Sequence, residues 1–342
     1  MKIIVSAVLA LIAGLLLTSC GGGGGGGGGN SSNGAQFSQT YVASATAGEV
    51  LSYTFDSVNS TYSYTITKSA YGLEGATSSG TLTRNSDGSY SPSESPSSKI
   101  YAAQNGLLIG RIRMLLNGTY RDVPILGVSN PSVSGADMAG TYNYISLNCA
   151  AKNYGVYSGC TTNYGTVQVV STGASTATYT TCTTANISNG TGSCAATTTG
   201  ALTHIGGGIW EMVRSGSANK SHMAALKSSN NQRVGFLDFN DGGAGGYGYG
   251  LAVASEQISP AISDVAGEYI AHTTAGTSGA FTIYSDSTTS HGLTITRDSP
   301  WTGIARTSSV GGQGYGILAG TGVYAYRNPQ NGSGYFEIGM RK

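Results

Sequence analysis

Most of this chain is a succession of short segments in which apolar and polar residues alternate, each bounded by Gly, Asn or Ser clusters. A period of two places neighbouring side chains on opposite faces of a strand, and Tyr, Thr, Ile and Val are favoured there. Windows with the 3.6-residue period of a helix are scarce. The sequence therefore predicts an all-β fold. The clearest predicted strands cover residues 50–55, 62–68, 80–84, 140–149, 165–170, 176–182, 281–285 and 292–297.

Two Pro-containing seams, Asn130-Pro131-Ser132 and Ser259-Pro260-Ala261, divide the body of the chain. Each is followed by a similar six-residue opening, D-M-A-G-T-Y from Asp137 and D-V-A-G-E-Y from Asp264, in which four positions are identical. Similar units repeated along a chain indicate related modules. We expect three antiparallel β-meander or small barrel-like modules, at residues 41–131, 132–259 and 260–342. Near its end each module has a Gly with apolar residues two and four positions later, at Gly110, Gly235 and Gly322.

One hairpin can be predicted residue by residue. Asn117-Gly118 is typical of a two-residue turn with positive φ, which fixes the register of its strands. Leu116 then faces Thr119, and Arg113 faces Asp122. The buried face would hold Ile112, Met114, Leu116, Val123 and Ile125, and the other face Arg111, Arg113, Tyr120 and Asp122. We expect an ion pair between Arg113 and Asp122 at the surface, in preference to an anion site formed by the two arginines.

The first nineteen residues have the pattern of an export signal. Lys2 precedes an apolar segment, residues 3–17, which is too short to span a bilayer. Leu17-Thr18-Ser19-Cys20 resembles the lipobox of bacterial lipoprotein precursors. The resemblance implies that residues 1–19 are removed and that Cys20 is acylated. The alternative, an ordinary secretory signal, would leave Cys20 as an unpaired thiol.

A run of nine glycines follows Cys20 and forms the core of a predicted tether, residues 20–40. The reach of such a glycine-rich coil is about 20 Å. Polyglycine tethers of this kind are similar to those of surface-displayed lipoproteins of Gram-negative bacteria. In that family an Asp after the lipidated cysteine favours retention at the inner membrane, whereas this chain has Gly21. The resemblance therefore implies a protein of the outer membrane, anchored in its lipid through acylated Cys20 and facing the cell exterior.

Four further cysteines, Cys149, Cys160, Cys182 and Cys194, predict two disulfides, because an even number is typical of exported proteins. Each ends a predicted strand or precedes the next, so all four fall at one end of a meander. The shortest connectivity pairs Cys149 with Cys160 and Cys182 with Cys194. A disulfide that closes a loop of this length stabilises a fold by about 2–3 kcal/mol. A metal site is not expected, since paired C-x-x-C spacings are absent from the sequence.

Composition excludes one class of partner. Only 10% of the residues are charged, against about 25% in an average soluble domain, and the formal net charge is +1. The sequence has no run of Lys and Arg that could contact the phosphates of a nucleic acid, so nucleic-acid binding is not expected. The 22 Tyr residues fit strand propensity and half-buried packing better than a dedicated binding surface.

No catalytic set of side chains can be recognised, so neither enzyme activity nor a cofactor is expected. The histidines are scattered, at His204, His222, His272 and His291, although the last two share a module and could meet across strands. The segment from Asp238 to Gly242 is similar to a calcium loop, but Tyr249 stands where a bidentate Glu is needed. A solvated hairpin turn is favoured there.

Two other groups of residues receive structural interpretations. The glycine-rich segments at residues 242–250 and 311–316 are predicted to be flexible loops, because neither leads from a buried strand into a helix. Trp210 and Trp301 could bind sugar or protein, but core packing is favoured for both.

The sequence thus predicts a non-enzymatic binding or adhesion module whose partner is an extracellular protein or glycan. The cross-linked loops between Cys149 and Cys194 are its expected contact edge. One alternative is a calycin-like carrier of a small apolar ligand, since Gly-x-Tyr at the module openings is similar to the Gly-x-Trp of lipocalins. The other is a structural protein of the envelope that faces the periplasm.

Overall fold

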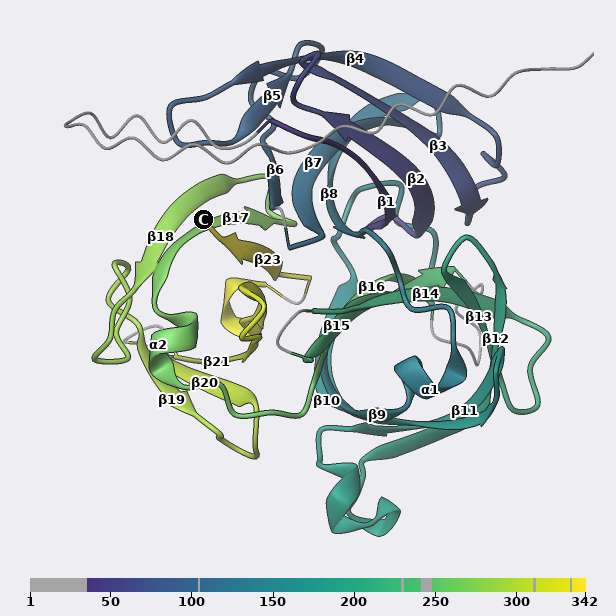
Figure 1. Ribbon diagram of the computed structural model, residues 1–342. Helices are drawn as coiled ribbons and strands as arrows, with labels where there is room; N and C mark the ends of the chain where they lie inside the picture. Colours follow the sequence, from purple (N-terminus) through teal and green to yellow (C-terminus); the bar gives the residue numbers. More distant parts are fainter. Residues whose placement is uncertain (1–35, 104, 229–230, 241–247, 310–311, 333) are drawn as a thin grey trace, which may run out of the picture. The chain divides into compact units, whose positions relative to one another are not determined.

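The computed structural model describes residues 36–103, 105–228, 231–240, 248–309, 312–332 and 334–342. The described chain is almost entirely β, which confirms the predicted fold class. It forms two closed eight-stranded barrels and one seven-stranded sheet (Figure 1). The predicted signal, Cys20 and most of the tether lie outside the described residues. No helix in the described part of the chain has the length and hydropathy needed to cross a membrane.

The first barrel is an antiparallel meander that closes when its last strand pairs with its first. The closing ladder runs from the Val42–Val128 pair to the Ala45–Ile125 pair. Its strands are β1 (Ser38–Ala45), β2 (Glu49–Asp56), β3 (Thr61–Ser69), β4 (Thr77–Arg84), β5 (Tyr90–Pro92), β6 (Ile100–Ala103), β7 (Leu107–Leu116) and β8 (Thr119–Val128).

The second barrel repeats this plan and closes between its first and last strands, where Tyr249 pairs with Cys149 and Glu256 with Tyr142. A one-turn helix, α1 (Gly135–Met138), lies across one end of it (Figure 1). The strands are β9 (Gly140–Cys149), β10 (Cys160–Gly173), β11 (Thr176–Thr183), β12 (Ala196–Gly206), β13 (Ile209–Arg214), β14 (Lys220–Lys227), β15 (Arg233–Asn240) and β16 (Tyr249–Glu256). Two 3₁₀ turns, η1 (Ile187–Asn189) and η2 (Thr191–Ser193), lie between β11 and β12.

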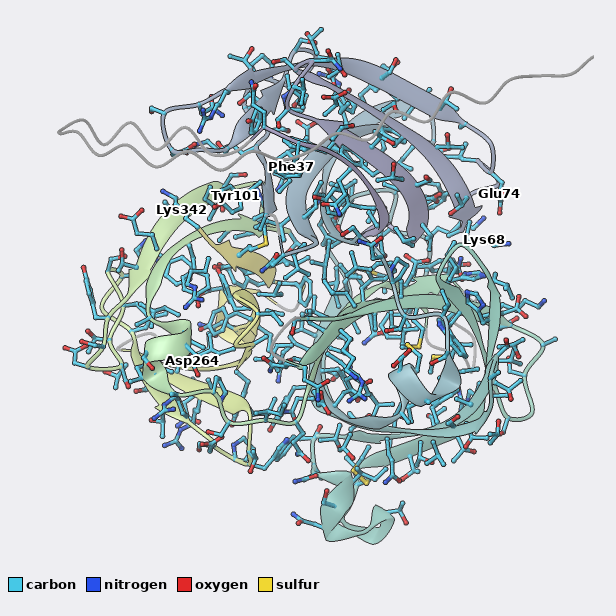
Figure 2. The ribbon with its side chains drawn as sticks, in the orientation of Figure 1. Phe37, Lys68, Glu74, Tyr101, Asp264 and Lys342 are labelled. Atoms are coloured by element: carbon cyan, nitrogen blue, oxygen red, sulfur yellow. A yellow bond between two sulfur atoms is a disulfide. The ribbon has the colours of Figure 1, made fainter. Side chains whose placement is uncertain are left out.

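The third sheet has the order β18-β17-β23-β22-β21-β20-β19. Another one-turn helix, α2 (Ile262–Val265), precedes it and contains Asp264, which is labelled in Figure 2. The Asp264 carboxylate accepts a hydrogen bond from the backbone N–H of Ala261 (3.2 Å). The strands are β17 (Gly267–Thr273), β18 (Ser278–Ile283), β19 (Thr294–Arg297), β20 (Ile304–Ser309), β21 (Gly312–Leu318), β22 (Val323–Arg327) and β23 (Phe336–Arg341), with the 3₁₀ turn η3 (Pro329–Asn331) before β23.

All eight predicted strands overlap observed ones. The strand predicted at 281–285 lies earlier in the chain than expected, as β18. β18 ends at Ile283, two residues before the predicted end. The chain turns there because Ser287 adopts a positive φ of 66° and its N–H donates to Tyr284 O (3.1 Å). The glycine-rich segment at 311–316 was expected to be a loop, which is wrong for residues 312–316, because they belong to β21; residue 311 lies outside the described residues.

The openings of the second and third modules share a hydrogen bond as well as a sequence. Tyr142 Oη donates to Met138 O (2.7 Å), and Tyr269 Oη donates to Val265 O (2.6 Å). In both cases the tyrosine of the first strand satisfies a carbonyl at the end of the one-turn helix, where helical partners are missing. The repeated motif is therefore a helix-to-strand junction held by one buried tyrosine.

The predicted register of the first hairpin is confirmed, including the Leu116–Thr119 and Arg113–Asp122 pairs. Asn117 and Gly118 have φ values of 49° and 72°, as a primed turn requires. The predicted Arg113–Asp122 ion pair is wrong. Arg113 donates instead to Glu94 O (2.8 Å) and lies over the Tyr120 ring, 5.0 Å from its centre.

Arg111 was expected at the surface, and it is buried. Its guanidinium donates to Thr273 O in the third sheet (2.7 Å) and to Asp122 O (2.6 Å). Burial lowers the pKa of Arg111 because the charged form loses its hydration. This arginine therefore joins two modules rather than serving as a surface anion site.

Residues 36–342 form one compact unit because the outer faces of the three modules bury one another. A single apolar cluster contains Leu126 from the first barrel, Ile145 from the second and Ile338 from the third sheet. Ser44 Oγ also donates to Asp238 Oδ1 (2.7 Å) between the two barrels. The modules are therefore not separate beads on a string.

The predicted disulfide pairing is confirmed: Cys149 is bonded to Cys160 and Cys182 to Cys194. The two loops that these bonds close differ in their surroundings. Within the first, Asn153 Nδ2 donates to Thr46 O in the first barrel (3.2 Å). The second loop is open to solvent, and residues 188–193 are all exposed. The second loop is therefore the more open part of the contact edge that the sequence predicts, although residues 150–152 of the first loop are exposed as well.

Candidate ligand-binding cavity

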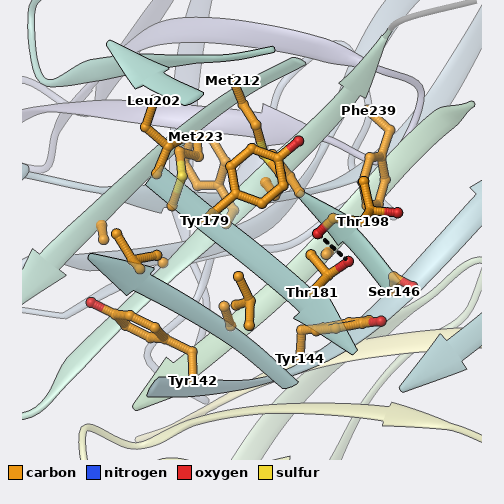
Figure 3. A pocket seen from close by; sticks show the side chains of 18 of the residues that line it. Tyr142, Tyr144, Ser146, Tyr179, Thr181, Thr198, Leu202, Met212, Met223 and Phe239 are labelled. Atoms are coloured by element: carbon orange, nitrogen blue, oxygen red, sulfur yellow. Dashed lines mark hydrogen bonds between the residues drawn. The ribbon is translucent and has the colours of Figure 1, made fainter. Parts of the chain in front are cut away.

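The interior of the second barrel is hollow. Side chains that point inward from its eight strands line a cavity of about 320 Å³ (Figure 3). Several inward positions on β14, β15 and β16 are occupied by very small residues, namely Ala225, Gly235, Ala252 and Ala254. An eight-stranded barrel is just wide enough to be filled by side chains or to hold one small ligand. Here the small residues leave that space open.

The first barrel provides a comparison within the same molecule. It has the same number of strands, but its interior is packed with large side chains. These include Tyr41, Tyr53, Phe55, Tyr62 and Tyr64, all of them buried. The cavity of the second barrel is therefore a consequence of its side chains and not of its strand number.

Glycines opposite tyrosines keep the space open in the second barrel. Tyr144 pairs across strands with Gly165, and Tyr179 pairs with Gly200. A Cβ added at Gly200 would lie 2.5 Å from Tyr179 Oη, and one at Gly165 would lie 2.8 Å from Tyr144 Oη. Each ring therefore lies flat on the glycine of the next strand instead of pointing across the barrel.

The end of the cavity nearest α1 is apolar and closed. Its lining includes Tyr142, Val169, Tyr179, Leu202 and Met212. Trp210 lies in the same apolar cluster as Met138 of α1, and neither side chain is exposed. The indole N–H of Trp210 donates to Ser132 O in the segment that links the first two modules (2.8 Å). The linking segment therefore forms part of the floor.

The opposite end, where the four cysteines lie, is lined by neutral polar groups. Asn148 Nδ2 donates to Ser146 Oγ (2.9 Å), Tyr144 Oη is hydrogen-bonded with Thr183 Oγ1 (3.2 Å), and Thr181 Oγ1 donates to Thr198 O (3.4 Å). Figure 3 labels these residues, except Asn148 and Thr183. None of the described residues that line the cavity is Lys, Arg, His, Asp or Glu.

Between these two ends, apolar side chains face unfilled space. Val167, Met223, Leu237 and Ala254 line the cavity and pack against the barrel core, but each remains partly accessible. Moving such surface out of water is favourable by about 25 cal/mol per Å². The cavity can therefore bind an apolar molecule with a few neutral polar groups, as ligand pockets of this size commonly do.

The four histidines do not come together. His222 and His272 are buried, and burial lowers their pKa values to about 4 and about 3, since the charged imidazolium would lose its hydration. His272 Nδ1 contacts Ser278 Oγ (2.9 Å), whereas His291 lines a cavity on the opposite face of the third sheet and packs on Phe281. The suggested meeting of His272 and His291 is therefore wrong.

The segment that begins at Asp238 is not the solvated turn that the sequence favoured. Asp238 and Asn240 belong to β15, and the Asp238 carboxyl group is fully buried between the two barrels. Burial raises its pKa well above the ordinary range. Residues 241–247, which include most of the predicted glycine-rich loop at 242–250, lie outside the described residues. Residues 249 and 250 begin β16.

Both tryptophans serve packing, as favoured. Trp210 is fully buried in the floor of the second barrel. Trp301 stacks on Tyr164 at a ring distance of 5.6 Å, and its indole N–H donates to Asn143 Oδ1 (2.8 Å). Trp301 therefore helps to hold the third module against the second.

The cavity lining could not be recognised from the sequence as one set of residues. One signal was available in the small inward residues of three successive strands, with Ala252 and Ala254 two residues apart in β16, Ala225 in β14 and Gly235 in β15. That pattern could be interpreted only once the strands were known to belong to one closed barrel.

The described residues contain no group of three or more His, Cys, Asp or Glu side chains placed to hold a metal ion. No protein-family model matches the chain, and a search of curated proteins finds no match for it.

Proposed function

We propose that this protein is a non-enzymatic binding protein that holds a small, largely apolar molecule inside its second barrel. The observation that carries this proposal is the unfilled apolar interior of that barrel, beside a first barrel of equal strand number whose interior holds many large, buried side chains. Stable interiors are normally close-packed, so a preformed void with part-exposed apolar walls favours a ligand.

The rest of the proposal follows from the amino-terminal segment. The lipobox at Cys20 and the glycine tether would attach the protein to the outer membrane, with its folded body held away from the lipid surface. A tethered carrier of this kind would present its ligand, or take it up, close to the membrane. The neutral lining favours an uncharged ligand over a fatty-acid anion, because no cation is available in it to pair with a carboxylate.

The ligand site can be blocked with one substitution. Ala254 lines the cavity, and a phenylalanine there would fill much of it. We expect Ala254→Phe to weaken binding of the neutral fluorophore 1-aminoanthracene at least tenfold in a fluorescence titration. Ala201→Phe is the matched control, since Ala201 is exposed on the outer face of β12, and it should bind like the unaltered protein. Equal binding by a folded Ala254→Phe variant would contradict the proposal.

A second candidate function is adhesion to an extracellular protein or glycan through residues 188–193. This segment is exposed and is closed by the Cys182–Cys194 disulfide, so contact would cost less ordering than in a free loop. Adhesion of this kind requires display outside the cell, whereas a tethered ligand carrier does not. We expect proteinase K to digest this protein on intact cells while a periplasmic control protein survives. Protection of both would instead favour a periplasmic carrier or a structural protein of the envelope.

A further inference from the structure

The third module contains a second cavity, of about 260 Å³, on the inner face of its sheet. Its chemistry differs from that of the second barrel, because aromatic rings and one carboxyl group share the lining. The rings come from two strands, β18 and β22, and from the loop before β23: Phe281, Tyr324, Tyr326 and Tyr335. The carboxyl group belongs to Glu337 in β23.

The aromatic rings stand at right angles to one another. Phe281 and Tyr324 have ring centres 5.1 Å apart with an interplanar angle of 83°. Tyr326 and Tyr335 are 6.4 Å apart, also at 83°. Edge-to-face pairs of this kind are stable arrangements of aromatic rings. They give the cavity walls in different orientations.

Glu337 is held in position by two of these tyrosines. Tyr335 Oη donates to Glu337 Oε2 (2.6 Å), and Tyr324 Oη donates to Glu337 Oε1. Both hydroxyl groups favour the ionised carboxylate, since they donate to it. The carboxyl group is therefore fixed at the cavity wall rather than free to turn toward bulk water.

This carboxylate has no cationic partner among the described residues. None of the four ion pairs found there includes Glu337. The cavity lining contains neither Lys nor Arg, and its one histidine, His291, packs on Phe281 at 5.8 Å and is exposed. An uncompensated negative charge in a largely apolar site is costly unless a positive charge joins it.

We propose that the cavity of the third module binds a small organic ammonium ion, with its charge at Glu337 and its alkyl groups against the surrounding aromatic rings. A cation over aromatic faces is attracted by the ring quadrupole, and aromatic cages are the recurrent means of binding quaternary ammonium groups. The fixed carboxylate adds direct charge attraction. This site does not depend on the proposed ligand of the second barrel, whose lining carries no charge.

The test compares choline with its uncharged isostere, 3,3-dimethyl-1-butanol, by isothermal titration of the whole folded protein. The titrations are made at pH 8, because burial raises the pKa of Glu337 to about 7 and the carboxylate is then ionised. We expect choline to bind and the isostere to bind at least tenfold more weakly. Equal binding of both probes, or of neither, would overturn the proposal.

Two variants locate the site. Glu337→Gln should reduce choline affinity at least tenfold, while the matched control Glu268→Gln, which changes an exposed carboxylate of the same module paired with Lys342, should leave it unchanged. If Glu337→Gln fails to fold, Phe281→Leu removes one ring without touching the carboxylate and should reduce affinity about fivefold or more. Unchanged choline affinity in either folded variant would contradict the assignment.

Discussion

Replacing Trp210 with alanine is expected to lower the free energy of unfolding by about 3–5 kcal/mol, the range for deleting a fully buried large aromatic side chain. No part of this side chain is exposed, and it packs beside Met138, Tyr142 and Leu202 at the floor of the second barrel. The substitution would also remove the hydrogen bond to Ser132 O. Urea denaturation followed by far-UV circular dichroism measures the loss.

Two further variants separate the contributions. Trp210→Phe keeps most of the apolar packing but loses the indole N–H, and should cost about 1–3 kcal/mol. Trp301→Ala removes a half-buried side chain at a module contact and should cost less than Trp210→Ala, about 1–2 kcal/mol. A Trp210→Ala protein as stable as the unaltered one would show that the barrel floor does not contribute to folding.

The stability of the protein should fall as the pH rises from 5 to 7, and Glu49 should account for much of the loss. Glu49, at the start of β2, is fully buried; Ser69 Oγ donates to its Oε1 (3.0 Å), and its Oε2 has no hydrogen-bond partner among the described residues. Burial, with smaller contributions from the nearby Asp238 and Glu74 carboxyl groups, raises its pKa from 4.5 to about 9, although hydrogen bonds from Ser69 and from the Ala70 backbone act to lower it.

The direction of this change in stability with pH follows from the linkage between proton binding and folding. A carboxyl group with a raised pKa in the folded state takes up a proton on folding. Its contribution to stability is therefore complete below the unfolded pKa and is lost as the pH rises toward 9. One proton corresponds to about 1.4 kcal/mol per pH unit, or about 2.7 kcal/mol between pH 5 and pH 7. Asp238, whose pKa burial also raises, acts in the same direction.

Glu49→Gln removes the proton that Glu49 takes up on folding. The slope of unfolding free energy against pH between pH 5 and pH 7 should therefore become shallower by about 1.4 kcal/mol per pH unit. Glu74→Gln is the control. Glu74 lies at the same end of the first barrel, near Lys68, but is exposed (Figure 2), so its replacement should leave the slope nearly unchanged. Equal slopes in the unaltered and Glu49→Gln proteins would contradict the assignment to Glu49.

Local signals in the sequence were enough to predict much of the fold. The Asn117-Gly118 turn fixes a register on its own, because only a two-residue primed turn suits that pair between paired strands. The disulfides followed from where Cys149, Cys160, Cys182 and Cys194 stand in a meander. Both arguments involve residues close together in the chain, so no knowledge of the tertiary arrangement was needed.

Long-range contacts explain what the sequence could not show. Arg111 alternates with apolar residues and so was predicted to face water, but the third module covers that face of β7. Asn153 is in a loop with a polar sequence, yet its partner, Thr46, is 107 residues away. A two-residue period reports which face a side chain takes and not whether another module covers that face.

The candidate cavity was hidden for a related reason. No single strand of the second barrel has an unusual sequence, and the empty space depends on the summed size of inward side chains from eight strands. The comparison of Tyr53 with Ala252, both inward-facing, became meaningful only when both barrels were seen to have the same number of strands.

The closure of each barrel by its first and last strands has a consequence for the order in which the molecule can form. Because β9 pairs with β16, one edge of β9 has no partner until residue 256 has been synthesised, whereas the β9–β10 hairpin and its disulfide need only residues 140–173. Unpaired strand edges invite association with other chains. During folding the second module should therefore pass through an open intermediate, cross-linked once the chain is in an oxidising compartment, and this is the stage at which a chaperone would be most useful to it.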